Sequence, residues 1–269
     1  MKRIFISGPS GCGKTTTVAR LQKVLKLKAD QETLRNLINV YGFQPPTLVA
    51  NAAIVDKLSP QLRNANLERL VRWQACQLHM HSQNASRGVV QDRCALDSLS
   101  YFLYDILHWE LSRGFNITDS VSVIIDSAFD ALTKPQDRSL ALQGIETTVR
   151  GALETSLEWG VDQDIIPAIV YILYNYIELL IATPGVYAVL TFNPYIQPEE
   201  DGVRSTNNDA MSAIQWIMVR IADTMRSRLS RETHTVYIEP VEGRLADSSE
   251  DLKRRYEALL NCFDDSIKV

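Results

Sequence analysis

The residues with the most distinctive chemistry lie near the start of the chain, where glycines, a lysine and threonines follow a short apolar run. Ile4, Phe5 and Ile6 lead into Gly8-Pro-Ser-Gly-Cys-Gly-Lys14-Thr15, which has the spacing G-x-x-x-x-G-K-T. Glycines adopt positive φ, so successive backbone N–H groups can converge on phosphate oxygens. The lysine can reach the β- and γ-phosphates, and the threonine hydroxyl can bind Mg²⁺. The pattern predicts a phosphate-binding loop between a strand and a helix.

A second set of candidate residues follows a predicted buried strand at 88–92. Asp92 ends this apolar run and Arg93 comes next. Because the carboxyl ends of parallel strands share one edge of a sheet, we expect Asp92 on the side of the phosphate loop. There it can hold Mg²⁺ through water or accept the proton of an attacking hydroxyl, while Arg93 neutralises phosphate charge. The alternative is a surface Asp–Arg pair. Asp97 begins the next helix, where a carboxylate is either functional or only a cap.

Two further pairs of polar residues have open interpretations. Glu32 and Arg35 lie where a short strand, 25–30, meets a helix, 31–40. They form either an ordinary ion pair or two groups that point into a cleft. Gln74 and Gln77 fall on or near the inner face of a helix that starts at Pro60. Glutamines can read a base edge, although uncharged polar residues on a half-exposed helix are commoner.

The elements that position these residues alternate between strand and helix. Besides those named above, we expect strands at 4–6, 185–194 and 233–240, and helices at 14–25, 210–229 and 251–260. This order predicts an α/β fold with a parallel sheet, helices on both faces and ligands at the carboxyl ends of the strands. Most arginines of the 210–229 helix should be solvated. The apolar run 165–182 predicts a buried helix instead of a membrane span, because it contains Pro167, Asn175 and Glu178.

Composition and charge narrow the class of protein. The chain has 269 residues, of which 45% are hydrophobic and 22% charged, as in globular proteins and not in disordered or fibrous ones. Its four cysteines are widely spaced, which argues against a zinc site or a disulfide framework. Without an export signal, we expect a cytoplasmic protein, in the host cytoplasm if the source is viral. Residues 1–72 carry a net charge of +8 against −4 for the whole chain, which fits a nucleotide or nucleic acid as ligand.

The order of these motifs resembles that of a known enzyme family. Asp92-Arg-Cys-Ala-Leu-Asp97-Ser-Leu-Ser-Tyr101, placed after a phosphate loop and an E-x-x-R motif, is similar to the AAA_28-type P-loop kinases. These are related to ribosylnicotinamide kinase and to deoxynucleoside and thymidylate kinases. The strand-like run 185–194 and Asp201-Gly-Val-Arg204, followed by a long amphipathic helix, resemble that family's lid. The matching segments are roughly 1–110 and 184–269.

The resemblance implies a P-loop NTPase three-layer sandwich that transfers the γ-phosphate of ATP, with Mg²⁺, to a nucleoside or nucleotide-like acceptor. Lys14 and Thr15 would carry phosphate and Mg²⁺, and Asp92 and Arg93 would form the catalytic pair, with Asp92 as a second metal ligand. Glu32 would bind an acceptor hydroxyl, and Arg204 would stabilise charge from the lid. The nucleotide-binding residues would be Gly8, Pro9, Ser10, Gly11, Cys12, Gly13, Lys14, Thr15 and Thr16.

The chain departs from the family between its two matching segments. We expect a kinase core at 1–112 and 184–269 and a helical insertion at 113–183, which is much longer than the family's connection. The insertion has a net charge of −6, so it should cover the cleft, form a homodimer or contact another protein, or be simple structural elaboration. Two alternatives to a small acceptor stay open. One is a phage-type kinase acting on hydroxymethylated pyrimidine, such as 5-hydroxymethyluracil, in DNA, and the other is an ATPase switch without an acceptor.

Overall fold

The structure is a computed structural model that describes residues 3–9, 11–25, 29–30, 59–84, 90–112, 117–134, 137–158, 160–191, 208–229, 233–238 and 248–267. The predicted helix at 31–40 lies outside the described residues. The same holds for four predicted site residues, which are Ser10, Glu32, Arg35 and Arg204.

A parallel sheet forms the centre of the described chain. Its strands are β1 (Ile4–Ser7), β2 (Ala29–Asp30), β3 (Val90–Asp92), β4 (Val186–Leu190) and β5 (His234–Ile238), in the spatial order β2-β3-β1-β4-β5. Every pair of neighbours is parallel. Strands β1, β3 and β4 are buried along their whole length, as parallel strands covered on both faces must be. The predicted α/β fold with a parallel sheet is confirmed.

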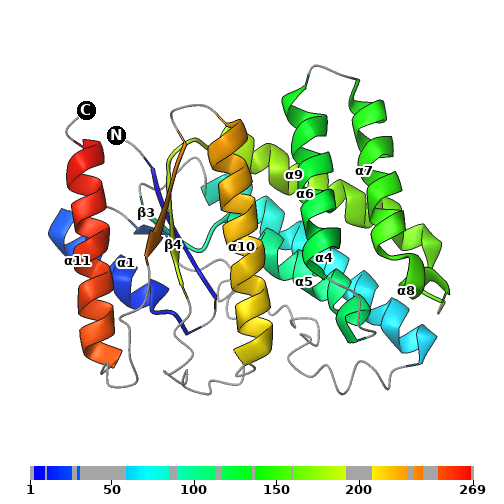
Figure 1. The fold of residues 1–269 in the computed structure, drawn as a ribbon, viewed down its shortest axis with the longest axis horizontal. Coiled ribbons are helices and arrows are strands. Elements are labelled where there is room, and N and C mark those ends of the chain that lie inside the picture. Colours follow the sequence, from blue (N-terminus) through cyan, green and yellow to red (C-terminus); the bar gives the residue numbers. More distant parts are fainter. Residues whose placement is uncertain are drawn as a thin grey trace.

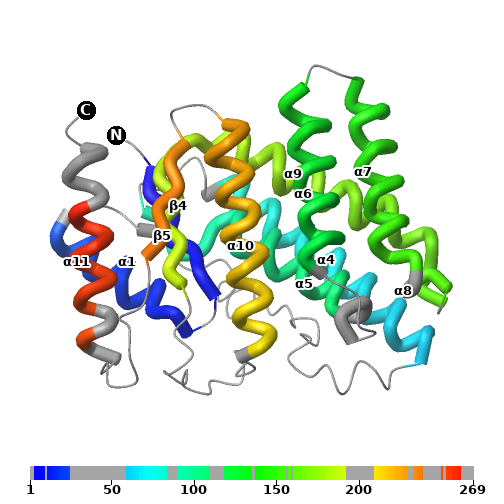
Figure 2. The backbone as a smooth tube through the Cα atoms, in the orientation of Figure 1, coloured from blue at the N-terminus to red at the C-terminus, as the bar shows by residue number. Residues whose placement is uncertain are grey.

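Helices cover both faces of the sheet (Figure 1). On one side lie α1 (Lys14–Leu25) and α11 (Ser248–Ile267), and on the other lies α10 (Asn208–Arg228). Alternate residues of β1 lie on opposite faces of the sheet. Ile4 and Ile6 pack in the core with Leu21 of α1, whereas Phe5 belongs to the core on the other side. Figure 2 shows β4 and β5 side by side between these helical layers. The sheet thus lies between two helical layers (Figure 1).

The face covered by α10 continues into a thick helical layer. It contains α4 (Pro60–Asn84), α5 (Ala95–Ser112), α6 (Ile117–Thr133), α7 (Arg138–Ala152), α8 (Glu154–Glu158), the 3₁₀ turn η2 (Gln163–Ile165) and α9 (Ile166–Ala182). The helical pattern predicted within 113–183 is therefore confirmed. One continuous apolar core includes side chains of α4–α7, α9 and α10 together with Phe5 and Tyr187 of the sheet. The helices of 113–183 thus complete the hydrophobic core on this face.

Helix α9 is the most apolar of the helices that the structure describes. The stretch Gln163–Ala182 is long and apolar enough to cross a membrane by length and composition, and 56% of its apolar window is buried inside the structure. Core helices of soluble proteins have the same properties, so this stretch is weak evidence for a membrane span. Its buried side chains include Ile169, Leu173, Tyr176 and Leu180. The predicted helix is present, and these side chains are buried as expected.

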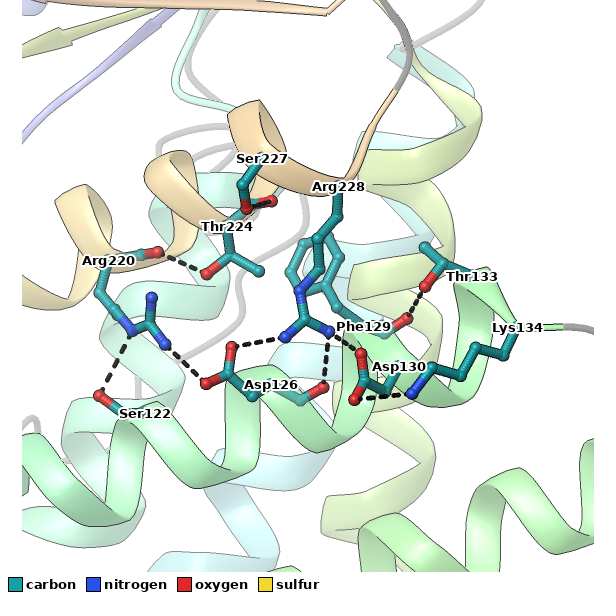
Figure 3. A network of polar contacts seen from close by, with 10 residues as sticks. All are labelled: Ser122, Asp126, Phe129, Asp130, Thr133, Lys134, Arg220, Thr224, Ser227 and Arg228. Carbon is teal, nitrogen blue, oxygen red and sulfur yellow. Dashed lines mark hydrogen bonds and ion pairs between the residues drawn. The ribbon is translucent and has the colours of Figure 1, made fainter.

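A row of polar contacts joins α6 to α10 (Figure 3). Asp126 lies between two arginines of α10, with its carboxylate 2.7 Å from Nη2 of Arg220 and 3.1 Å from Nη2 of Arg228. Arg228 also donates to Asp130, and Arg220 donates to Ser122. We call these residues the α6–α10 clamp. Arg220 and Arg228 are only partly exposed, whereas most arginines of this helix were expected to be solvated, because α6 supplies carboxylates at matching spacing.

Candidate phosphate-binding site

The glycines of the predicted phosphate loop have geometry that other residues would not accept. The loop connects β1 to α1, as predicted, and Gly11 and Gly13 have φ values of 81° and 85°. L-residues with side chains rarely adopt such values. At Gly8 the restriction is space, since a Cβ atom would lie 2.5 Å from Cys12 Sγ and 2.5 Å from the carbonyl oxygen of Leu190. The loop backbone is therefore fixed by its glycines and by β4.

Lys14 is buried at the first position of α1, with 5% of its surface exposed. Its ammonium group donates hydrogen bonds to the carbonyl oxygens of Gly8 and Pro9, the second at 2.7 Å. The charge thus lies inside the curve of the loop, beside the N-terminus of a helix, where backbone N–H groups and the helix dipole also favour an anion. Thr15 and Thr16 follow on the first turn of α1 and are exposed. This arrangement can bind a polyphosphate.

Asp92 and Arg93 lie where the sequence predicts, at the carboxyl end of β3. Asp92 is aligned with Ile6 of β1, two residues before Gly8, and is 4% exposed. Arg93 donates its backbone N–H to the carbonyl oxygen of Ile6 at 3.1 Å and has a φ of 62°, the only positive value among the described non-glycine residues. This conformation is uncommon outside glycine and concentrates at functional sites. The chain therefore turns sharply beside the phosphate loop, directly after the buried carboxylate.

Asp97, which the sequence leaves as either a cap or a functional group, contacts both the helix start and the loop. Its Oδ2 accepts a hydrogen bond from the backbone N–H of Cys94 at 3.0 Å, and its Oδ1 accepts one from Gly8 at 3.2 Å. Cys94 lies 3.3 Å from the Ser7 hydroxyl, and burial together with the charge of Asp97 raises the pKa of its thiol to about 12. A thiol with this pKa is protonated at neutral pH, so Cys94 is no nucleophile.

A buried polar cluster lies next to Asp97, between α4, α5 and α9. Gln77 accepts the Ser98 hydroxyl at 2.6 Å, and His81 Nε2 lies 2.8 Å from the same Ser98 oxygen. Gln74 accepts the Tyr176 hydroxyl at 2.8 Å. Both glutamines are buried, as predicted for the inner face of this helix, and each is bonded to a neighbouring helix.

His81 is a member of this cluster that sequence reasoning missed. Since Ser98 donates its proton to Gln77, its oxygen accepts the Nε2–H of His81. Burial, and secondarily the positive charge of Arg93, lowers the pKa of His81 to about 4. Arg93 therefore lies close enough to α4 to act on it. A helical spacing of Gln74, Gln77 and His81 on one face of α4 was the signal that could have revealed the cluster.

The predicted metal ligands are Thr15 and Asp92. Among the described residues, no group of three or more His, Cys, Asp or Glu side chains could hold a metal ion. Mg²⁺ at phosphate sites usually keeps several waters and takes one or two protein oxygens together with phosphate oxygens. An exposed hydroxyl on α1 and a buried carboxylate at the end of β3 are the oxygen donors that such a site requires, so these residues fit Mg²⁺ bound together with a nucleotide.

Comparison of the chain with protein-family models, with curated proteins and with solved structures finds no match.

Proposed function

We propose that this protein is an ATP-dependent kinase with a P-loop NTPase fold, which transfers the γ-phosphate to a hydroxyl or phosphate of a nucleoside or nucleotide-like acceptor. The observation that carries the proposal is the buried ammonium group of Lys14 inside a glycine loop, between β1 and α1 and next to the strand that ends in Asp92. A buried cation whose partners are two backbone carbonyls and the sulfur of Cys12, all uncharged, is well placed to bind an anion.

The position of the loop in the sheet supports the P-loop NTPase fold. Strand β1, which leads into the loop, is the central strand, and β3 with Asp92 is its direct neighbour. Ligands of open parallel sheets bind at the carboxyl ends of the strands. The phosphate loop and Asp92 both follow carboxyl ends of adjacent strands, so a nucleotide bound in the loop would have its phosphates near this carboxylate.

The chain's own residues would act by positioning and charge neutralisation. On nucleotide binding, Lys14 would exchange the carbonyl oxygens of Gly8 and Pro9 for phosphate oxygens, and the loop N–H groups would hold the β-phosphate. Asp92 would orient the attacking hydroxyl by accepting its hydrogen bond, and Arg93 would offset charge on the transferring group. Bound Mg²⁺ would supply further neutralisation of the phosphates.

The test is transfer of labelled γ-phosphate from ATP in the presence of Mg²⁺. The acceptors are free nucleosides, nucleoside monophosphates, and DNA with ordinary or hydroxymethylated pyrimidines. Label on a nucleoside or monophosphate supports the proposal. Label only on DNA would indicate that the acceptor is a base in a polymer instead of a small molecule. Label only in free phosphate would indicate an ATPase switch.

Two lysines of α1 provide a matched pair of variants. Lys14→Ala should lower label transfer about 100-fold or more, the usual effect of removing a group that binds transition-state charge. Lys23→Ala should leave transfer unchanged, because Lys23 is exposed at the far end of the same helix. Equal turnover of the two variants would contradict the assignment of the loop.

A further inference from the structure

Asp97 forms a connection between two segments that leave adjacent strands in different directions. After β1 the chain enters the phosphate loop at Gly8, and after β3 it turns at Arg93 into α5. One carboxylate, 2% exposed, accepts hydrogen bonds from both segments, at 3.2 Å from Gly8 and 3.0 Å from Cys94. The first residue of the loop is thereby bonded to the first turn of α5.

A carboxylate is the side chain that this position requires. Asp97 lies three residues after Cys94, the residue that precedes α5, so its bond to Cys94 is the ordinary reciprocal bond of a helix N-terminus. Such a cap uses one oxygen. The second oxygen accepts the N–H of Gly8, and both N–H groups need an acceptor because burial removes them from water. Asparagine offers a single oxygen and would turn its NH₂ group toward one of the two donors.

Gly8 is thus held by a hydrogen bond and by close packing. Asp97 accepts its N–H, and the carbonyl oxygen of Leu190 and Cys12 Sγ occupy the space where a Cβ atom would lie. The carbonyl oxygen of Gly8 accepts a hydrogen bond from Lys14. The N–H of Gly8 is committed to Asp97, so the N–H groups that the loop offers to phosphate begin after Gly8. The position of Gly8 therefore sets where the loop and the lysine lie.

We propose that Asp97 is a positioning residue of the phosphate site, which holds Gly8 so that the loop is ordered before a nucleotide binds. This inference rests on the proposed function. A loop that is ordered in advance loses less conformational entropy on binding, so the affinity for a polyphosphate is higher. Loss of the Asp97–Gly8 bond should weaken nucleotide binding without any contact between Asp97 and the nucleotide.

The experiment measures ATP binding by titration calorimetry and exchange of the Gly8 amide hydrogen by NMR, for wild type and Asp97→Asn. We expect binding about tenfold weaker in the variant, the effect of one lost hydrogen bond to a charged group, and faster Gly8 exchange. Asp97→Glu keeps the charge but displaces the oxygens, so it should give a smaller loss of affinity. It also serves as the test variant if Asp97→Asn does not fold.

A second helix cap provides the control. Asp137 accepts the backbone N–H of Ser139 at 2.7 Å at the start of α7 and makes no contact with the loop. Asp137→Asn should lower the melting temperature slightly and leave ATP affinity and Gly8 exchange unchanged. Unchanged affinity and unchanged Gly8 exchange in both Asp97 variants would overturn the inference. A wild-type protein that binds no ATP would overturn the proposed function, and Gly8 exchange would then decide whether Asp97 holds the loop.

Discussion

The geometry of the α6–α10 clamp predicts how much one of its carboxylates contributes to the stability of the protein. Asp126→Ala removes the carboxylate that contacts Arg220 at 2.7 Å and Arg228 at 3.1 Å. These side chains are partly exposed, at 39% for Asp126, 31% for Arg220 and 26% for Arg228. Their ion pairs are therefore screened by water, and the large values that apply to fully buried pairs do not apply.

The expected loss of stability follows from the two ion pairs that the substitution removes. Each pair should contribute about 0.5–1 kcal/mol, which is the upper range for surface pairs with good geometry. Removing both should lower the free energy of unfolding by about 1–2 kcal/mol, since Arg228 keeps its second partner, Asp130. A matched exposed pair is Arg254–Glu250 on α11, with an N–O distance of 2.7 Å and exposures of 58% and 52%. Glu250→Ala should cost only about 0.3–0.5 kcal/mol.

Urea denaturation of the two variants at low and high salt measures these differences. The cost of Asp126→Ala should fall as salt rises, because ions screen charges that are partly exposed. A double-mutant cycle of Asp126→Ala with Arg220→Ala should give a coupling energy of about 0.5–1 kcal/mol. If Asp126→Ala cost no more than Glu250→Ala, or if the coupling energy were zero, the clamp would not join α6 to α10 energetically and the reasoning would fail.

Four further substitutions test other parts of the fold. The pKa of His81 is about 4 in the folded protein, against an ordinary 6.5, so the free energy of unfolding should be full above pH 6.5 and fall by at most about 3 kcal/mol as the pH drops toward 4. The variant His81→Gln should lack this pH dependence when urea denaturation is measured at several pH values. Gly185→Ala should lower the free energy of unfolding by about 1–3 kcal/mol, because its Cβ would lie 2.7 Å from the carbonyl oxygen of Arg3. Gly144→Ala on α7 should raise the free energy of unfolding by about 0.5–1 kcal/mol, because its Cβ would have no atom within 4 Å. Tyr176→Phe should lower the free energy of unfolding by about 1–2 kcal/mol, measured by thermal melting, because Gln74 loses the donor at 2.8 Å; an unchanged melting temperature would contradict that bond.

Local patterns determined much of the secondary structure. The helix predicted at 14–25 has the bounds of α1, and the strands predicted near Ile4, Asp92, Tyr187 and Val236 are present. Glycine spacing and apolar periodicity are local signals, and they act on neighbours along the chain. Bounds were less well predicted: the closing helix, expected at 251–260, extends over Ser248–Ile267. Helix ends depend on capping and packing, which periodicity does not report.

The sequence by itself also determined that a glycine-rich loop follows the first strand and that Asp92 ends a parallel strand. Only the tertiary structure decided which oxygen of Asp97 faces Gly8, that His81 joins the glutamines of α4, and that Asp126 contacts two arginines of α10. These contacts join residues 89, 17 and 94 positions apart in the chain. A backbone pattern specifies which face of a helix is buried, but the partner across that face is set by the packing of whole elements, and that packing brings distant side chains within hydrogen-bonding distance.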